Sequence, residues 1–214
     1  MKIEVGIYGL KDRPTLRETD KSVFTAMGRH AQLLYDGETI FPCRLGPKAH
    51  WKRSLHHLTL LADRSDADAV LLFEDDIRAS VGLGEWLDRE LCRFTAGEVG
   101  VISLYTASSI KKHPGWNVMP RIERPHAVPL GACALLFPVG SAKAFLKEDP
   151  DLHRNTGQGG SLLKWCQKTG REWWFHSPSF VQHVGVESTL GLPINADRQA
   201  GDFVEEIDLS GNPL

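Results

Sequence analysis

Three consecutive carboxylates, Glu74, Asp75 and Asp76, directly follow the apolar run AVLLF, residues 69–73. A continuous apolar run is typical of a strand covered on both faces, as in a parallel sheet flanked by helices. The carboxylates then stand at the carboxyl end of that strand, where open α/β sheets bind their ligands. In an extended chain, Glu74 and Asp76 point the same way and Asp75 points the opposite way. Glu74 and Asp76 could therefore share a hard divalent cation, because oxygen ligands favour Mg²⁺ or Mn²⁺ over Zn²⁺.

A second group of chemically useful residues lies in FHSPSFVQHVGVESTLG, residues 175–191. His183 could bring a neutral imidazole toward a metal or a pyrophosphate, and Gly185 would permit close backbone approach there. The alternatives are a structural histidine and an acidic strand end that only solubilises the chain and caps a turn. The two groups are informative together, since each supplies ligands that the other lacks.

Hydrophobic periodicity predicts the elements that must position these groups. A strand over 3–9 is followed by a polar loop with Arg13 and Arg17, and then by a helix through Leu34. The remaining helices are expected from Pro47 to about residue 65 and over 84–94, 141–147 and 161–170, and the strands over 39–45, 69–73, 99–105, 131–138 and within 172–185. This alternation predicts a single three-layer α/β domain with a mostly parallel central sheet over residues 1–191, and a loosely held tail over 192–214.

Composition sets broad limits on the class of protein. The chain has 214 residues, 42% hydrophobic and 24% charged, which is typical of a globular domain with its own core. The net charge of −2 gives no overall attraction to nucleic acid. No signal peptide or membrane-spanning run is visible, so we expect a cytoplasmic protein without a membrane partner. The cysteines fit no zinc or disulfide pattern and are predicted to be reduced core thiols: Cys43, Cys92, Cys133 and Cys166.

The motifs LLFEDDI and PSFVQHVGVESTLG together resemble those of glycosyltransferases with the GT-A fold. The pattern is most similar to the N-acetylglucosaminyltransferase IV family (family 54) and its relatives. The order of IYGLKDRPTLRETDKSV, LLFEDDI and GACALLFP also fits, so the resemblance spans most of residues 3–191. It implies a GT-A-like α/β/α domain that binds a nucleotide-diphosphate sugar, with a UDP-sugar favoured, through Mn²⁺ or Mg²⁺.

The resemblance also implies roles for individual residues. Asp76 would be the principal metal ligand, joined by Glu74 and completed by His183. Glu74 and Asp75 would orient the donor ribose or the water ligands of the metal. Arg13 and Arg17 would lie near the nucleotide, where a guanidinium can pair with phosphate, although arginines in a polar loop are often only solvated.

The catalytic base is a point of departure from the resembled pattern. Inverting transfer needs a carboxylate base beside the acceptor hydroxyl. Related enzymes often carry an acid at the start of the helix after GACALLFP, but that neighbourhood reads HRNTGQGGSLL, with Gln158 and glycines where Asp or Glu is expected. The remaining candidates for the base are Asp149, Asp151 and Glu187.

A basic and aromatic stretch, SSIKKHPGWNVMPRIERPH at 108–126, is the candidate acceptor-binding segment. Nucleic-acid grooves use this mixture of phosphate-pairing charge and stacking surface, whereas the alternative is a solvated loop. The acceptor would then be a base in DNA, such as a hydroxymethylated pyrimidine flipped out of the stack, and a saccharide is the competing acceptor. The residues concerned are Lys111, Lys112, Trp116, Arg121 and Arg124.

The sequence therefore predicts a metal-dependent glycosyltransferase that uses a hydroxyl acceptor. A metal-dependent phosphoesterase would also use clustered carboxylates, but further Asp and His ligands would be expected at other strand ends. A non-catalytic nucleotide-sugar-binding module would keep the fold without needing the acidic cluster. A Walker loop, a dinucleotide fingerprint and the Gly-rich loop of a sugar-nucleotide pyrophosphorylase are all absent from the sequence.

Overall fold

The apolar run that precedes the three carboxylates forms strand β3 (Ala69–Glu74) inside a seven-stranded sheet with the order β2-β1-β3-β7-β5-β8-β6. The pairs β2–β1, β1–β3 and β5–β8 are parallel, and β7 and β6 run antiparallel to their neighbours. Most strands therefore point in one direction, as predicted. The structure is a computed structural model that describes residues 2–9, 13–35, 47–94, 98–107, 110–120, 133–148, 158–185 and 199–214.

The helices and strands alternate along the first half of the chain, as the periodicity predicts. The helices are α1 (Leu16–Met27), α2 (Pro47–Ser65), α3 (Leu83–Glu90), α4 (Val139–Glu148) and α5 (Gln158–Thr169), with a 3₁₀ turn η1 (Leu91–Arg93). The other strands are β1 (Ile3–Gly9), β2 (Gln32–Tyr35), β4 (Ile77–Ala79), β5 (Val99–Ser103), β6 (Gly115–Val118), β7 (Ala134–Pro138), β8 (Glu172–Ser177) and β9 (Val181–His183). Strands β4 and β9 form a separate antiparallel pair.

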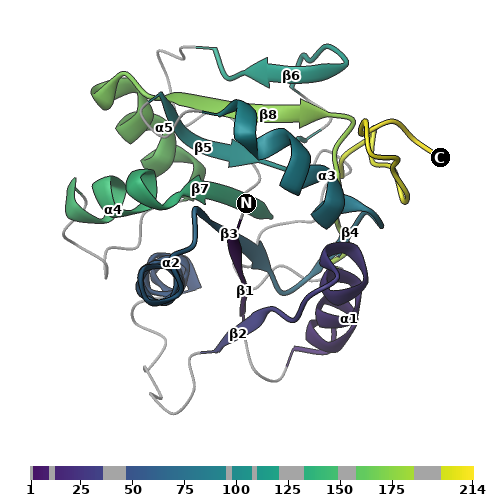
Figure 1. Cartoon of the computed structure of the whole chain (residues 1–214), viewed down its shortest axis with the longest axis horizontal. Coiled ribbons are helices and arrows are strands. Elements are labelled where there is room, and N and C mark those ends of the chain that lie inside the picture. The colour runs from purple at the N-terminus through teal and green to yellow at the C-terminus, as the bar shows by residue number, and fades with distance from the viewer. Residues whose placement is uncertain are drawn as a thin grey trace.

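Helices cover both faces of the large sheet (Figure 1), with α2, α4 and α5 on one side and α1 and α3 on the other. Alternate residues of β3 are buried in different clusters: Leu71 and Phe73 pack with α1 and α3, and Val70 and Leu72 pack with α2. This two-sided burial is what the continuous apolar run predicts. The three-layer α/β/α class predicted from the sequence is confirmed.

The first helix differs from its prediction at both ends. It begins at Leu16, inside the predicted polar loop, and it ends at Met27. Gly28 adopts a left-handed conformation (φ 63°) and donates its N–H to the carbonyl of Phe24, which closes the helix. Leu34 continues the helical spacing by coincidence and lies in β2 instead. The predicted strand over 39–45 lies outside the described residues.

The predicted helix over 84–94 is α3 followed by the 3₁₀ turn. Three short strands, β2, β4 and β6, were not predicted. Cys133 and Cys166 are buried free thiols, as predicted. The prediction for Cys92 was wrong, because its side chain is exposed after α3, and Cys43 lies outside the described residues. No helix in the described part of the chain is long and apolar enough to cross a lipid bilayer.

The C-terminal segment, residues 199–214, is held closely against the domain and not loosely as expected. Ala200 and Ile207 are buried in the core cluster that contains α1 and α3. Glu206 forms a β-bridge with Val81, and a Cβ atom on Gly211 would lie 2.6 Å from the indole nitrogen of Trp86. The buried residues of this segment are isolated apolar residues among polar ones, so the sequence shows no periodic pattern that would predict their burial. The boundary after residue 191 remains a prediction.

Candidate metal centre

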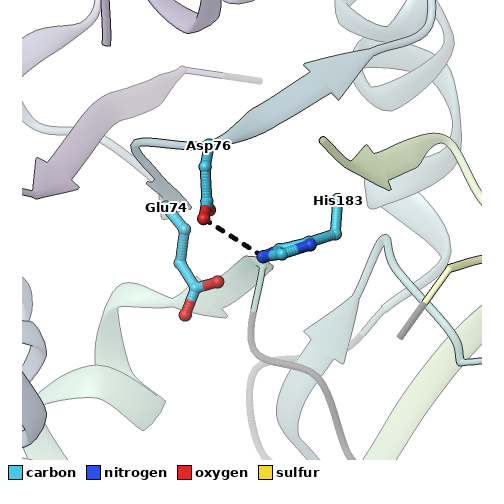
Figure 2. Close-up of side chains that lie close together, drawn as sticks. All are labelled: Glu74, Asp76 and His183. Atoms are coloured by element: carbon cyan, nitrogen blue, oxygen red, sulfur yellow. Dashed lines mark ion pairs between the residues drawn. The ribbon is translucent and has the colours of Figure 1, made fainter. Parts of the chain in front are cut away.

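Glu74, Asp76 and His183 lie together at the carboxyl edge of the sheet (Figure 2). One ligand atom from each residue lies within 4.8 Å of the others. His183 Nε2 is 3.1 Å from Asp76 Oδ2. Pairing of β4 with β9 places His183 opposite Ile77 and so beside Asp76. The structure thus joins the two groups of residues that the sequence singled out.

The turn between β3 and β4 carries Asp75 and Asp76 and is fixed from two sides. Thr19, on α1, accepts the N–H of Ile77 at 3.1 Å, and its hydroxyl lies 3.1 Å from the Asp75 carbonyl. From the other side, the N–H of Val184 donates to the Asp76 carbonyl at 2.8 Å. Thr19 lies inside α1 and positions this turn.

The chemistry of the cluster fits a divalent cation. Asp76 is only 3% exposed, and its Oδ1 atom has no hydrogen-bond partner among the described residues. A buried carboxylate oxygen without a partner is costly, and a cation would satisfy it. Opposite ligands of a Mg²⁺ ion lie about 4.2 Å apart, so the three ligand atoms need only a small adjustment. Carboxylate oxygens and an imidazole nitrogen are both common ligands of divalent metal ions in proteins.

The pKa shifts of Glu74 and Asp76 also fit a cation at this site. Burial, followed by the charge of Asp76, raises the pKa of Glu74. Burial also acts to raise the pKa of Asp76, but the hydrogen bond and charge of His183, together with Arg13, outweigh it and lower that pKa. The protein therefore keeps Asp76 ionised and places Glu74 against its charge, an arrangement that a bound cation relieves.

Arg13 reaches both aspartates through a forked pair of contacts. Its Nη1 lies 2.6 Å from Asp75 Oδ1, and its Nη2 lies 2.6 Å from Asp76 Oδ2. Arg13 thus stands at the candidate site, while Asp75 faces Arg13 and is not part of the three-residue cluster. Arg17 lies in the first turn of α1 and not in the predicted loop, and its side chain is exposed.

Tyr8 is a site residue that the sequence did not single out. Its hydroxyl donates to Glu74 Oε1 at 2.8 Å, because Tyr8 and Glu74 are direct partners in the parallel pairing of β1 with β3. The signal was present in the sequence, since both predicted strands end at the same edge of a parallel sheet. The predicted catalytic carboxylates Asp149, Asp151 and Glu187 lie outside the described residues.

Trp116, a described member of the predicted acceptor-binding set, lies in β6, away from the Glu74–Asp76–His183 cluster. Strand β6 lies four positions from β3 in the sheet, a separation of about 19 Å at ordinary strand spacing. Trp116 stacks on Trp86 with ring centroids 5.3 Å apart and donates to Glu90 Oε2 at 3.2 Å. Lys111 is exposed. The other members of the set, Arg121 and Arg124, lie outside the described residues.

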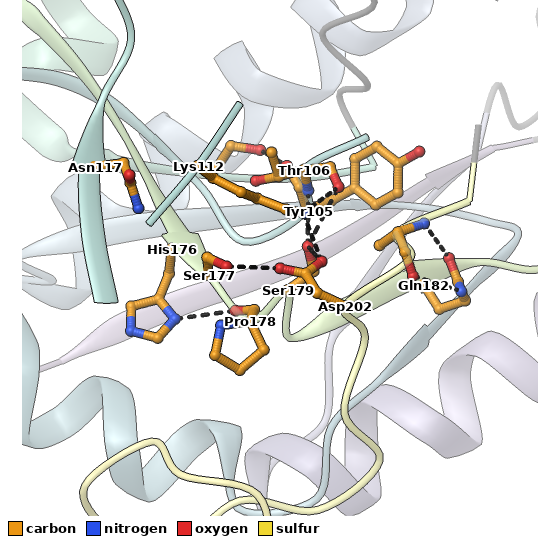
Figure 3. A network of polar contacts seen from close by, with 12 residues as sticks. Tyr105, Thr106, Lys112, Asn117, His176, Ser177, Pro178, Ser179, Gln182 and Asp202 are labelled. Atoms are coloured by element: carbon orange, nitrogen blue, oxygen red, sulfur yellow. Dashed lines mark hydrogen bonds and ion pairs between the residues drawn. The ribbon is translucent and has the colours of Figure 1, made fainter. Parts of the chain in front are cut away.

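Lys112 belongs to a polar network that holds the C-terminal segment (Figure 3). Its Nζ lies 2.6 Å from Asp202 Oδ1. Ser179 donates to the same oxygen at 3.0 Å, and Ser177 donates to Asp202 Oδ2 at 2.8 Å. Both carboxylate oxygens of Asp202 are thereby occupied, so this network is an anchor for the segment.

Solved structures with a similar fold include a glycosyltransferase involved in the glycosylation of the major capsid of PBCV-1. It matches with a TM-score of 0.53 and 10% identity over 89% of this chain and 96% of that chain. The apo-form glycosyltransferase GlyE from Streptococcus pneumoniae TIGR4 gives 0.42 and 16%, over 81% of this chain and 45% of that chain. The inositol-1-phosphate CTP transferase from T. maritima gives 0.39 and 12%, over 82% and 71%.

No protein-family profile and no curated protein matches the chain in sequence. The similarity to the PBCV-1 glycosyltransferase extends over nearly the whole of both chains, so the two share one fold. The predicted fold class is therefore confirmed by an independent structure. The narrower resemblance to the N-acetylglucosaminyltransferase IV family remains a prediction.

Proposed function

We propose that the protein is a metal-dependent glycosyltransferase that moves a sugar from a nucleotide-diphosphate sugar, preferably a UDP-sugar, to a hydroxyl acceptor. The observation that carries the proposal is the convergence of Glu74, Asp76 and His183 at the carboxyl edge of a sheet with a glycosyltransferase fold. Ligands of open α/β sheets bind at this edge. Among the described residues, the buried Oδ1 atom of Asp76 has no hydrogen-bond partner, which supports a cation at this position.

The roles of the residues follow from their positions. Asp76, Glu74 and His183 would hold Mn²⁺ or Mg²⁺. Such a cation, when bound, supplies the positive charge that neutralises the departing nucleoside diphosphate. The Arg13 guanidinium contacts Asp75 and Asp76, and one of its NH2 groups would turn toward a donor phosphate when the donor binds. Asp75 would then orient Arg13 or the donor ribose, and Arg17 remains a proposed contact to the nucleotide.

The base and the acceptor complete the proposal. Asp149, Asp151 and Glu187 are the proposed candidates for the carboxylate that takes the acceptor proton. The acceptor would be a saccharide or a hydroxymethylated pyrimidine in DNA. Because Lys112 pairs with Asp202 and Trp116 is packed against Trp86, the described part of the proposed DNA groove rests on Lys111. We therefore favour a saccharide as the acceptor.

A phosphoesterase and a non-catalytic binding module would each use the residues at the carboxyl edge of the sheet differently. A metal-dependent phosphoesterase needs further ligands at other strand ends, and within the described residues only Glu74, Asp76 and His183 form such a group of three. A non-catalytic nucleotide-sugar-binding module would not need the Glu74–Asp76 pair, whose charges repel. Transfer to a hydroxyl acceptor accounts for both the cation site and the fold.

A thermal-shift experiment tests the proposal. UDP, GDP, CMP and their sugars would each be added with Mn²⁺ or with a chelator to the wild type and to Asp76→Asn. At a hundred times its Kd a ligand stabilises a protein by about 2.7 kcal/mol, which moves the midpoint of a domain of this size by about 5 to 10 °C. Asp88→Asn, on the exposed side of α3, is the matched control.

The outcomes separate the proposed functions. We expect one nucleotide diphosphate to shift the wild type and Asp88→Asn only with Mn²⁺, and Asp76→Asn not at all. An equal shift in the presence of chelator would show that the metal dependence is wrong. If no nucleotide shifts the wild type, the glycosyltransferase proposal fails, and release of inorganic phosphate from phosphate esters would then favour the phosphoesterase.

A further inference from the structure

Glu74 is held by a hydrogen bond from the sheet itself. Tyr8 donates its hydroxyl to Glu74 Oε1 at 2.8 Å, and the phenol is only 7% exposed. The thiol of Cys133 is a second hydrogen-bonding neighbour of the Glu74 carboxylate, and the Cys133 carbonyl accepts the Glu74 N–H at 2.9 Å. The carboxylate therefore enters the cluster in an orientation set by its neighbours in β1 and at the start of β7.

Gln158 completes this arrangement from the first residue of α5. Its side-chain Nε2 donates to the hydroxyl oxygen of Tyr8. A phenol has a single proton, so a Tyr8 oxygen that accepts from Gln158 directs that proton to Glu74. The hydrogen bonds thus run in one direction, from Gln158 to Tyr8 to Glu74. The amide accounts for the absence of a carboxylate at this position, because a glutamate at 158 would accept from Tyr8 and compete with Glu74.

We propose that Tyr8 and Gln158 are positioning residues that orient Glu74 for divalent-cation binding, a role that rests on the proposed metal-dependent function. Partners that orient a metal ligand change affinity by about 10- to 100-fold when they are removed. Gln158 would thus replace an expected catalytic acid with a neutral group that acts through Tyr8. Helix α5 is thereby linked to the metal centre although none of its residues joins the Glu74–Asp76–His183 cluster.

Direct titration of Mn²⁺ into the protein, by calorimetry and without any donor, tests this role. Tyr8→Phe removes only the hydroxyl, and Gln158→Glu reverses the direction of the first hydrogen bond. We expect each variant to bind Mn²⁺ about 10- to 100-fold more weakly than the wild type. Tyr105→Phe, which removes a hydroxyl from another buried tyrosine, should bind as the wild type does. Unchanged circular dichroism would show that each variant is folded.

A double-mutant cycle separates orientation of Glu74 from a general effect on packing. In a Glu74→Gln background, Tyr8→Phe should cause no further loss of Mn²⁺ affinity, because the oriented carboxylate is already gone. Gln158 is partly exposed at the start of α5, so its variant folds even if Tyr8→Phe does not.

The outcomes distinguish this proposal from the function on which it rests. If the wild type binds Mn²⁺ and both variants match it, the positioning role is wrong while the metal-dependent function stands. If losses in the Glu74→Gln background are additive, Tyr8 acts through another group and the role is again wrong. If the wild type itself fails to bind Mn²⁺ or Mg²⁺, the metal dependence and the positioning role fall together.

Discussion

Gly185 lies directly against Asp76: a Cβ atom built on Gly185 would stand 2.3 Å from Asp76 Oδ2 and 3.1 Å from Cε1 of His183. The preceding N–H, from Val184, donates to the Asp76 carbonyl. The backbone after β9 thus forms one wall of the candidate metal centre, and only a residue without a side chain fits there. The sequence predicted a close backbone approach at Gly185, and the structure shows that it is made to a carboxylate.

Gly185→Ala should therefore damage the candidate metal centre. The Gly185 backbone is not left-handed, so alanine causes no dihedral strain and acts only through its methyl group against Asp76. We expect Mn²⁺ affinity to fall at least tenfold, with a loss of about 1–3 kcal/mol in the free energy of unfolding from overpacking. Calorimetric titration and urea denaturation measure the two effects. Gly140→Ala, in an open position of α4, should leave both unchanged or slightly raise stability.

Arg13→Gln should separate cation binding from donor binding. The Arg13 guanidinium would compete with a cation for Asp76 Oδ2, from which its Nη2 atom is 2.6 Å away. Removing this positive charge should therefore tighten Mn²⁺ binding roughly tenfold in the absence of nucleotide. The same change should weaken binding of a nucleoside diphosphate in the presence of Mn²⁺. Titrations with each ligand test both directions, with Arg29→Gln as the surface control. Weaker Mn²⁺ binding by the variant would contradict the competition.

Asp202→Asn should loosen the C-terminal segment. The variant weakens the contacts to Lys112 and the two serines, so the free energy of unfolding at pH 7 should fall by about 1.5–3 kcal/mol, the usual size for a hydrogen bond to a charged group. Proteolysis should cut the segment sooner. Glu205→Gln, in an exposed pair with Arg78, is the control in the same segment and should change little.

The pH dependence of this effect has a definite sign. Burial acts to raise the pKa of Asp202, but the hydrogen bonds of Lys112 and Ser177 outweigh it and lower that pKa. A carboxyl with a lowered folded pKa stabilises the protein above the ordinary aspartate value near 3.9, and this contribution is lost as the pH falls through the folded pKa. The difference between wild type and Asp202→Asn should shrink below about pH 4. A difference that stays constant with pH would exclude the charge as its source.

His176 should make the protein less stable in mild acid. Burial lowers its pKa, and the hydrogen bond to the Pro178 carbonyl only partly opposes this. Since the unfolded chain takes up the proton more readily, stability is complete above about pH 6.5 and is lost as the pH falls through the folded pKa. His176→Phe keeps a ring beside Phe180 and should flatten this loss in urea denaturation between pH 7 and 5. His57→Gln, on the exposed face of α2, should not.

The sequence predicted the sheet and the position of the acidic residues at its edge because the signals there are local. The run before Glu74 is apolar on both faces, and the spacing of Trp51, Leu55 and Leu58 matches the buried face of α2. The end of α1 was misread, since the spacing continues past Gly28 and periodicity does not report a left-handed glycine. Burial of Ile207 depends on contacts with distant parts of the chain, which no local pattern contains.

The candidate site was predictable as two groups of residues but not as one geometry. Alternation placed Glu74 and Asp76 together, whereas only the pairing of β4 with β9 brings His183 to them. Tyr8 and Gln158 were not assigned because a tyrosine and an amide have many ordinary uses, and their direction of hydrogen bonding appears only in three dimensions. The predicted base candidates and part of the acceptor segment lie outside the described residues.

The pairing of β4 with β9 also governs when the centre can exist. Next to this pair, Ser80 donates to the carbonyl of Phe180, which is 100 residues away, so the pairing is a long-range contact that closes a long loop. At ordinary rates of synthesis, Asp76 leaves the ribosome roughly 5 to 20 s before His183. A nascent chain would thus hold the carboxylates without the imidazole, and the three candidate ligands would come together only when the last strand arrives.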